Sequence, residues 1–283
     1  MVEARLRLGA PIFDDCGDPD TWIGALRRKG YTAAYCPLQA GVGDGLVRAY
    51  EKAAAEAGVV IAEVGAWSNP LSPNEDERRD ALCKCQEQLA LADSIGARCC
   101  VNIAGSLGQR WDGPHAADLL PAAFDLIVES VRAIIDAVKP SRSYYTLETM
   151  PWMYPDSADS YLRLIEAVSR ARFAVHFDPV NLICSPQRYF DNRRVIQDFC
   201  RKLGSRIRSC HGKDVAMDTR FLTHLDEVRP GLGHLDYRIL LQELARLEPD
   251  VPLMLEHLPG EEDYDLAAAY VRAAAHDAGI SFC

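Results

Sequence analysis

The sequence predicts an α/β fold, a single (β/α)₈ TIM barrel that spans residues 1–283 as one domain. Short apolar runs alternate with longer amphipathic stretches along the chain, which is typical of parallel βαβ units. Eight such units fit the 283 residues well, because a barrel of this kind typically needs about 250. The main alternative, a doubly wound open sheet, is disfavoured because no GxGxxG turn follows the first apolar run.

The apolar runs that we expect to form the eight strands lie between helical patterns and turn-forming residues. They cover residues 6–13, 31–37, 59–67, 97–105, 144–151, 173–182, 207–214 and 253–258. Helical patterns with recognisable start and stop signals cover residues 18–30, 74–94, 116–138, 157–171, 186–203, 236–247 and 263–278. We find no linker or low-complexity segment between them, so the pattern favours one domain.

Charge and composition restrict the partners that this protein is expected to have. The formal net charge of −10 is spread along the chain, which disfavours binding to nucleic acid or to an anionic membrane surface. The first residues lack the pattern of a secretory signal, and no apolar run approaches the roughly 18 residues of a membrane span. The ten cysteines form no CxxC pair, so we interpret them as free, mostly buried thiols of a cytoplasmic protein.

The last four predicted strands each end on a side chain that can bind a metal. These residues are Glu148, Asp178, His211 and Glu256, at intervals of 30, 33 and 45 positions. One barrel unit averages about 31 residues, so each interval matches one unit, the last with a longer loop at residues 215–235. Because side chains alternate between the faces of a strand, the carboxylates are expected to point into the barrel. The active sites of TIM barrels lie at these strand ends.

Three carboxylates and one imidazole in an apolar barrel would repel one another unless a cation balances their charge. A set rich in oxygen with one histidine suits one divalent ion such as Mn²⁺, the favoured candidate, or Mg²⁺ or Co²⁺. The alternative is that each acid separately pairs with a nearby lysine or arginine, or caps a helix. The repetition at successive strand ends favours the metal.

At these residues the sequence resembles the xylose isomerase-like TIM barrel superfamily, in particular its sugar isomerase/epimerase branch. The motifs that carry the resemblance are the strand ending in Glu148, DPVN at 178–181, HGKD at 211–214, PGLGHLDY at 230–237 and the strand ending in Glu256. The resemblance implies that Glu148, Asp178, His211 and Glu256 bind one divalent metal. It also implies that Glu148 and Glu256 act as a catalytic acid/base pair.

The chain departs from the epimerase pattern near these motifs. The sugar 3-epimerases carry a histidine three residues after the metal-binding aspartate, where this chain has Asn181, while His176 lies two residues before that aspartate. They also carry an arginine where this chain has Met217, with Arg220 as a candidate substitute. We interpret His176 either as a substrate contact or as a hydrogen-bonding group beneath the metal, and Asn181 as a substrate-binding residue.

Several further residues are candidates for contacts with a sugar. Trp67 and Trp111 follow the third and fourth expected strands and either stack on substrate or pack structurally. Lys213 is expected either to neutralise a substrate oxygen or to pair with Asp214. His257 has the parity of an outward-facing residue and is interpreted as structural.

The predicted function is that of a metal-dependent isomerase or epimerase. It would move a proton next to the carbonyl of a small unphosphorylated keto-sugar through an enediolate. The alternative is a lyase or dehydratase that eliminates a group β to the carbonyl of an oxidised sugar or 3-keto-glycoside. A non-catalytic sugar-binding barrel is the third possibility, and a homo-oligomer is compatible with all of them.

Overall fold

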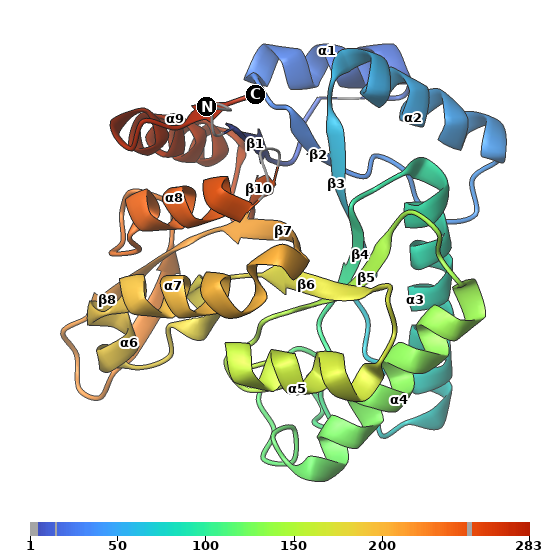
Figure 1. The fold of residues 1–283 in the computed structure, drawn as a ribbon, viewed down its shortest axis with the longest axis vertical. Coiled ribbons are helices and arrows are strands. Elements are labelled where there is room, and N and C mark those ends of the chain that lie inside the picture. The colour runs from blue at the N-terminus through green and yellow to red at the C-terminus, as the bar shows by residue number, and fades with distance from the viewer. Residues whose placement is uncertain (1–4, 15, 248–250) are drawn as a thin grey trace.

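The computed structural model describes residues 5–14, 16–247 and 251–283, and it shows the predicted barrel, with strands at the centre and helices around them (Figure 1). All hydrogen-bonded neighbours in the nine-stranded sheet are parallel, in the order β11-β1-β10-β7-β6-β5-β4-β3-β2. The strands are β1 Arg5–Gly9, β2 Ala33–Tyr35, β3 Val60–Gly65, β4 Cys99–Asn102, β5 Tyr144–Glu148, β6 Phe173–Phe177, β7 Ile207–Gly212, β10 Pro252–Leu255 and β11 Ser281–Phe282. The sheet curls until β2 contacts β1, where Thr32 N donates to Leu8 O at 3.0 Å.

The helices follow the strands as the amphipathic patterns predict. They are α1 Pro19–Lys29, α2 Asp44–Ala57, α3 Glu75–Ile95, α4 Pro121–Val138, α5 Ala158–Val168, α6 Pro186–Phe190, α7 Asn192–Leu203, α8 Tyr237–Leu247 and α9 Glu261–Asp277. Helix α2 was not among the seven expected helices, and the pattern at residues 186–203 forms two helices, α6 and α7. Local signals explain the ends of α3: Asn74 caps its first turn, and Gly96 ends it in the left-handed region at φ 76°.

Strand β6 shows how the barrel separates its two faces. Phe177 points outward and stacks on Phe199 of α7 with ring centroids 4.2 Å apart. His176 points inward, where its ring centroid lies 4.1 Å from that of His211 on β7. All five residues of the strand are buried. The alternation predicted from the sequence is therefore correct for this strand.

The long segment at residues 215–235 contains an antiparallel hairpin of strands β8 Asp214–Asp218 and β9 His224–Val228. Asp214 anchors it, because its carboxylate accepts backbone N–H bonds from residues 215, 231, 233 and 235 at 2.9–3.1 Å. A side chain at Gly233 would lie 2.3 Å from Asp214 Oδ1, which explains why this turn contains glycine. The hairpin thus starts three residues after the predicted ligand His211.

None of the ten cysteines forms a disulfide, and only five of them, Cys85, Cys99, Cys100, Cys200 and Cys210, are buried. Among the described residues, no helix combines the length and the apolar character needed to cross a membrane.

Candidate metal centre

The structure brings together the four side chains at the strand ends. Glu148, Asp178, His211 and Glu256, here called the ligand cluster, each offer an atom that lies within 4.8 Å of the others. His211 Nδ1 lies 2.8 Å from a Glu256 oxygen, 3.2 Å from Glu148 and 3.6 Å from Asp178. The first three residues are buried and Glu256 is nearly so, because its side chain is 12% exposed. This arrangement is the one that the strand-end pattern predicts.

Local hydrogen bonds fix two of these carboxylates. Asp178 directly follows β6, and its Oδ1 accepts the backbone N–H groups of Val180 (2.9 Å) and Asn181 (3.1 Å). The other oxygen of Asp178, Oδ2, therefore faces the remaining members of the ligand cluster. Asn181 Nδ2 donates to Glu148 Oε1 at 2.9 Å, so this asparagine orients one member of the predicted acid/base pair.

Lys213 also enters the cluster. Its Nζ lies 2.6 Å from Glu256 Oε1, 2.8 Å from Asp178 Oδ2 and 3.6 Å from Glu148 Oε1, and the residue is 2% exposed. The proposed pairing with Asp214 is replaced by these contacts, since the Asp214 carboxylate holds the backbone of the following loop.

Burial and the neighbouring charges shift the pKa values of the two glutamates of the cluster in opposite directions. Burial raises the pKa of Glu148 against the lowering effect of Lys213 and His211. Burial also acts on Glu256, but the charges of His211 and Lys213 outweigh it and hold its pKa below the ordinary value. Burial lowers the pKa of His211, yet Glu256, Glu63 and Glu148 together hold it well above the ordinary value. The two glutamates are thus chemically unequal.

Sequence reasoning missed Glu63, which lies beneath the cluster on β3. Its Oε1 accepts hydrogen bonds from His176 Nε2 (2.9 Å) and from the Ser209 hydroxyl, and its Oε2 lies 3.3 Å from His211 Nε2. All of these residues are buried. Burial raises the pKa of Glu63, but the charges and hydrogen bonds of His176 and His211 outweigh it and hold that pKa below its ordinary value. An acid inside the apolar run VVIAEVGAW was the signal that could have revealed it.

The residues present fit a divalent cation. Asp178 Oδ2 and Glu256 Oε1 are buried and face the cluster, where Lys213 Nζ lies 2.8 Å from the first and 2.6 Å from the second. Carboxylate oxygens and an imidazole nitrogen that converge in this way are ligand atoms that Mg²⁺ and Mn²⁺ take. A divalent ion together with the Lys213 ammonium would offset the three carboxylates, with His211 Nδ1 as the nitrogen ligand.

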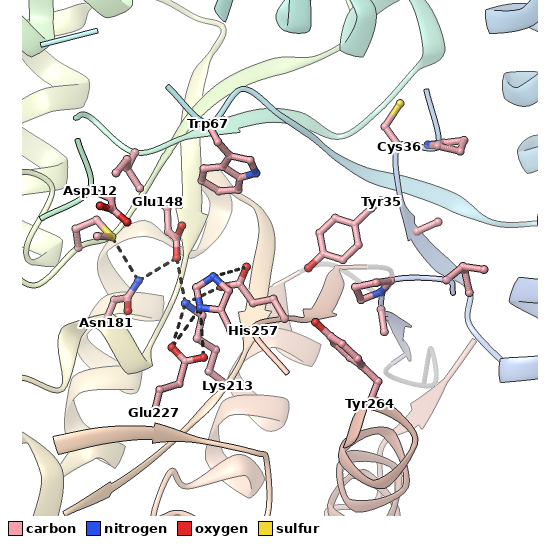
Figure 2. Close-up of a pocket in the computed structure, with 18 of the residues that line it drawn as sticks. Tyr35, Cys36, Trp67, Asp112, Glu148, Asn181, Lys213, Glu227, His257 and Tyr264 are labelled. Carbon is pink, nitrogen blue, oxygen red and sulfur yellow. Dashed lines mark hydrogen bonds and ion pairs between the residues drawn. The ribbon is translucent and has the colours of Figure 1, made fainter. Parts of the chain in front are cut away.

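A cavity of about 920 Å³ opens above the cluster (Figure 2). Glu148, Glu256, Lys213 and Asn181 line its inner end. Figure 2 shows Trp67, Tyr35 and Tyr264 around the same space, and Trp111 and Trp152 also line it. The structure therefore brings Trp67, Trp111 and Asn181 together at one cavity, and their contact with substrate stays a prediction.

Three other residues lie differently from the simplest expectation. His176 is fully buried beneath the cluster and hydrogen-bonded to Glu63, which matches the second of the two interpretations given for it. Arg220 lies on the exposed hairpin, where it pairs with Asp218 at 2.7 Å. His257 lines the cavity, 3.3 Å from Glu227 of β9, and so does not have the outward orientation that its parity indicated. Strand parity failed there because β10 ends at Leu255 and His257 adopts a left-handed φ of 59°.

The fold and the site together define a TIM barrel enzyme with a buried candidate metal-binding site at the carboxyl ends of its strands. The chain belongs to the Xylose isomerase-like TIM barrel family, whose model matches residues 10–274. No functionally curated protein sequence matches it significantly.

Solved structures of the same fold are similar along nearly the whole chain. One is a Xylose isomerase-like TIM barrel protein from Mycobacterium smegmatis in complex with magnesium (17% identity, TM-score 0.67, 99% of both chains covered). Another is D-psicose 3-epimerase with D-tagatose from Clostridium cellulolyticum H10 (14%, 0.69, 97% of this chain and 99% of that chain). A third is the probable 3-DHS dehydratase of petrobactin synthesis from Bacillus anthracis (15%, 0.69, 94% and 97%). At these identities the similarity establishes the fold.

Proposed function

We propose that this protein is a divalent-metal-dependent isomerase or epimerase that moves a proton next to the carbonyl of an unphosphorylated keto-sugar. The observation that carries the proposal is that Glu148 and Glu256 belong to the ligand cluster and also line the cavity. They come from β5 and β10, which are separated by two strands in the sheet, so they approach a bound substrate from different directions. Asp178 and His211 lie beneath them and are fully buried.

A bound Mn²⁺ or Mg²⁺ supplies positive charge that stabilises the oxygens of an enediolate. The protein's own groups provide the proton transfers. One of the two glutamates removes the proton from the carbon beside the carbonyl, and the other returns a proton at the same or the neighbouring carbon. Asn181 holds Glu148 in place through its hydrogen bond, and the Lys213 ammonium lies where it can bind a sugar oxygen. The structural neighbour crystallised with D-tagatose is consistent with a sugar substrate.

An elimination reaction uses the same enolate and is the second candidate. Glu227 and His257 line the cavity and lie 3.3 Å apart, so they form a further acid that could protonate a leaving group. The similarity to a probable dehydratase supports this alternative. The hydrogen bond that His257 donates to Glu227 raises the pKa of His257, and burial partly opposes this effect.

Incubation in D₂O tests both candidates. The Mn²⁺-loaded protein would be given a panel of ketoses and 3-keto-glycosides, and the products followed by mass spectrometry and NMR. Isomerisation or epimerisation introduces deuterium beside the carbonyl without other loss, whereas elimination releases water or the aglycone. We expect Glu148→Gln and Glu256→Gln to abolish incorporation, while the surface variant Glu56→Gln retains it. Failure of the wild type to bind Mn²⁺, or full exchange by both site variants, would contradict the proposal.

A further inference from the structure

The cavity is much larger than a single keto-sugar requires. Its volume of about 920 Å³ lies near the upper end of the ~300–1,000 Å³ range of cavities that enclose drug-sized ligands. The residues of the proposed chemistry, such as Glu148, Glu256 and Lys213, line only one part of it. The remaining volume is large enough to hold a second group attached to the sugar.

Tryptophan dominates the rest of the wall. The chain has four tryptophans and all of them, Trp22, Trp67, Trp111 and Trp152, line this cavity. Trp67, Trp111 and Trp152 are 38%, 36% and 37% exposed, so each leaves indole surface uncovered. Large apolar side chains gathered at an exposed site mark a place where a ligand or partner binds. Here the cavity makes a ligand the suitable occupant.

The indole positions are built into the fold. The Trp67 ring folds back over Gly65, where a Cβ would lie 2.4 Å from its Nε1, so only glycine admits this orientation. Trp152 Nε1 donates to Asp112 O at 3.0 Å and thereby ties the loop after β5 to the loop after β4. The aromatic wall is thus held in place before any ligand binds.

Four of the polar side chains around this wall already have partners within the protein. Arg110 and Asp112 pair through Nε and Oδ1 at 2.7 Å. Tyr35 donates its hydroxyl to Leu255 O at 3.1 Å, and the Tyr264 hydroxyl accepts from Leu258 N at 3.3 Å. A second sugar ring would need many hydrogen-bonding partners, whereas a flat apolar group needs only surfaces on which to stack.

We infer that the substrate is a keto-glycoside whose aglycone is a flat, apolar aromatic group that stacks between the tryptophans. This inference rests on the proposed function for its sugar end, since the oxidised ring would lie at Glu148 and Glu256. The aglycone end rests on the wall formed by Trp67, Trp111 and Trp152.

Binding of unoxidised glycosides tests the aglycone end without any turnover. Calorimetry on the Mn²⁺-loaded protein would compare phenyl α- and β-D-glucosides with the matching methyl glucosides and with cellobiose. We expect the better phenyl glucoside to bind at least about tenfold more tightly than its methyl counterpart, because an aromatic ring buries more apolar surface and stacks. Trp111→Ala and Trp152→Ala should remove this preference, whereas Phe190→Ala, an exposed aromatic on α6, should retain it.

Equal binding of phenyl and methyl glucosides, or tighter binding of cellobiose, would overturn the inference. So would a preference that survives both tryptophan variants. Thermal melting of each variant excludes unfolding as the cause of a loss. Failure of the proposed function is distinguishable, because it appears as absent deuterium exchange in a protein that still prefers the phenyl group.

Discussion

Glu63 offers the sharpest test of how the barrel prepares its metal site. Its carboxylate can only accept hydrogen bonds, so it fixes the proton of His211 on Nε2, 3.3 Å away, and leaves Nδ1 free to bind a metal. In Glu63→Gln, the amide oxygen can still accept the hydrogen bonds of His176 and Ser209. The amide NH₂ group of the new glutamine then faces His211. Because that NH₂ group is a donor, Nε2 of His211 would have to accept a hydrogen bond and the imidazole proton would move to Nδ1. A protonated Nδ1 cannot bind a metal.

The magnitude follows from the contacts that are lost. Changing a hydrogen-bonding partner of a metal-binding histidine typically lowers metal affinity about 10–100-fold. One of three buried donors also loses its acceptor, which should lower the free energy of unfolding by about 1–3 kcal/mol. Glu56→Gln is the matched control, because that side chain is 68% exposed and its contact with Lys52 spans 3.7 Å.

Titration with Mn²⁺, with the free ion followed by electron paramagnetic resonance, gives the dissociation constants directly. We expect the affinity of Glu63→Gln to fall within the 10–100-fold range above while Glu56→Gln matches the wild type. Chemical denaturation measures the stability of both variants. If Glu63→Gln is folded and binds Mn²⁺ within about twofold of the wild type, the reasoning about the histidine proton is wrong.

Three further predictions concern other parts of the molecule. Lys213→Met should bind Mn²⁺ more tightly than the wild type but lose activity, because the ammonium competes with the metal for the carboxylates of the ligand cluster. Gly65→Ala should displace the Trp67 indole and weaken phenyl glucoside binding without changing Mn²⁺ affinity. Burial raises the pKa of Asp93, but backbone N–H groups of residues 141–143 lower it further, so Asp93→Asn should cost stability at pH 7. Because the folded pKa is the lower one, that cost should shrink as the pH falls below the unfolded value of about 3.9.

Calorimetry with Mn²⁺ and with phenyl glucoside checks the first two predictions, and denaturation between pH 7 and pH 2 checks the third. Weaker Mn²⁺ binding by Lys213→Met would contradict the competition, and unchanged glucoside binding by Gly65→Ala would contradict the crowding of Trp67. If the stability difference between Asp93→Asn and the wild type is independent of pH, the ionised carboxylate of Asp93 does not contribute to the free energy of unfolding.

The repeated parts of the fold were predictable because they follow simple periodicities. Alternating apolar and amphipathic runs identify the barrel, and polar residues at the ends of successive strands identify Glu148, Asp178, His211 and Glu256. Both signals arise from geometry that every unit shares: strands point the same way, and their carboxyl ends meet at one face.

The irregular parts were not predictable in this way. Glu63 lies within a strand and not at its end, so its spacing carries no signal, and only its apolar neighbours mark it. The hairpin of β8 and β9 is only partly buried, so its sequence lacks the alternation of a strand with one buried face. The position of His257 depends on a left-handed backbone conformation just beyond β10, which strand parity cannot describe.

The junction of β1 and β2 has a consequence for how a bulky molecule enters. In the described part of the chain, these two strands lie side by side without a hydrogen-bonded ladder, whereas β5, β6, β7 and β10 form a continuous one. Ala10 and Pro11 beyond β1, and Ala34 and Tyr35 of β2, line the cavity. Separation of the two strands would widen the cavity beside β10, the strand that leads to Glu256, because β1 pairs with β10 and the Tyr35 hydroxyl donates to Leu255 O at 3.1 Å. The ladder of β5, β6 and β7, which positions Glu148, Asp178 and His211, would stay intact during such a widening.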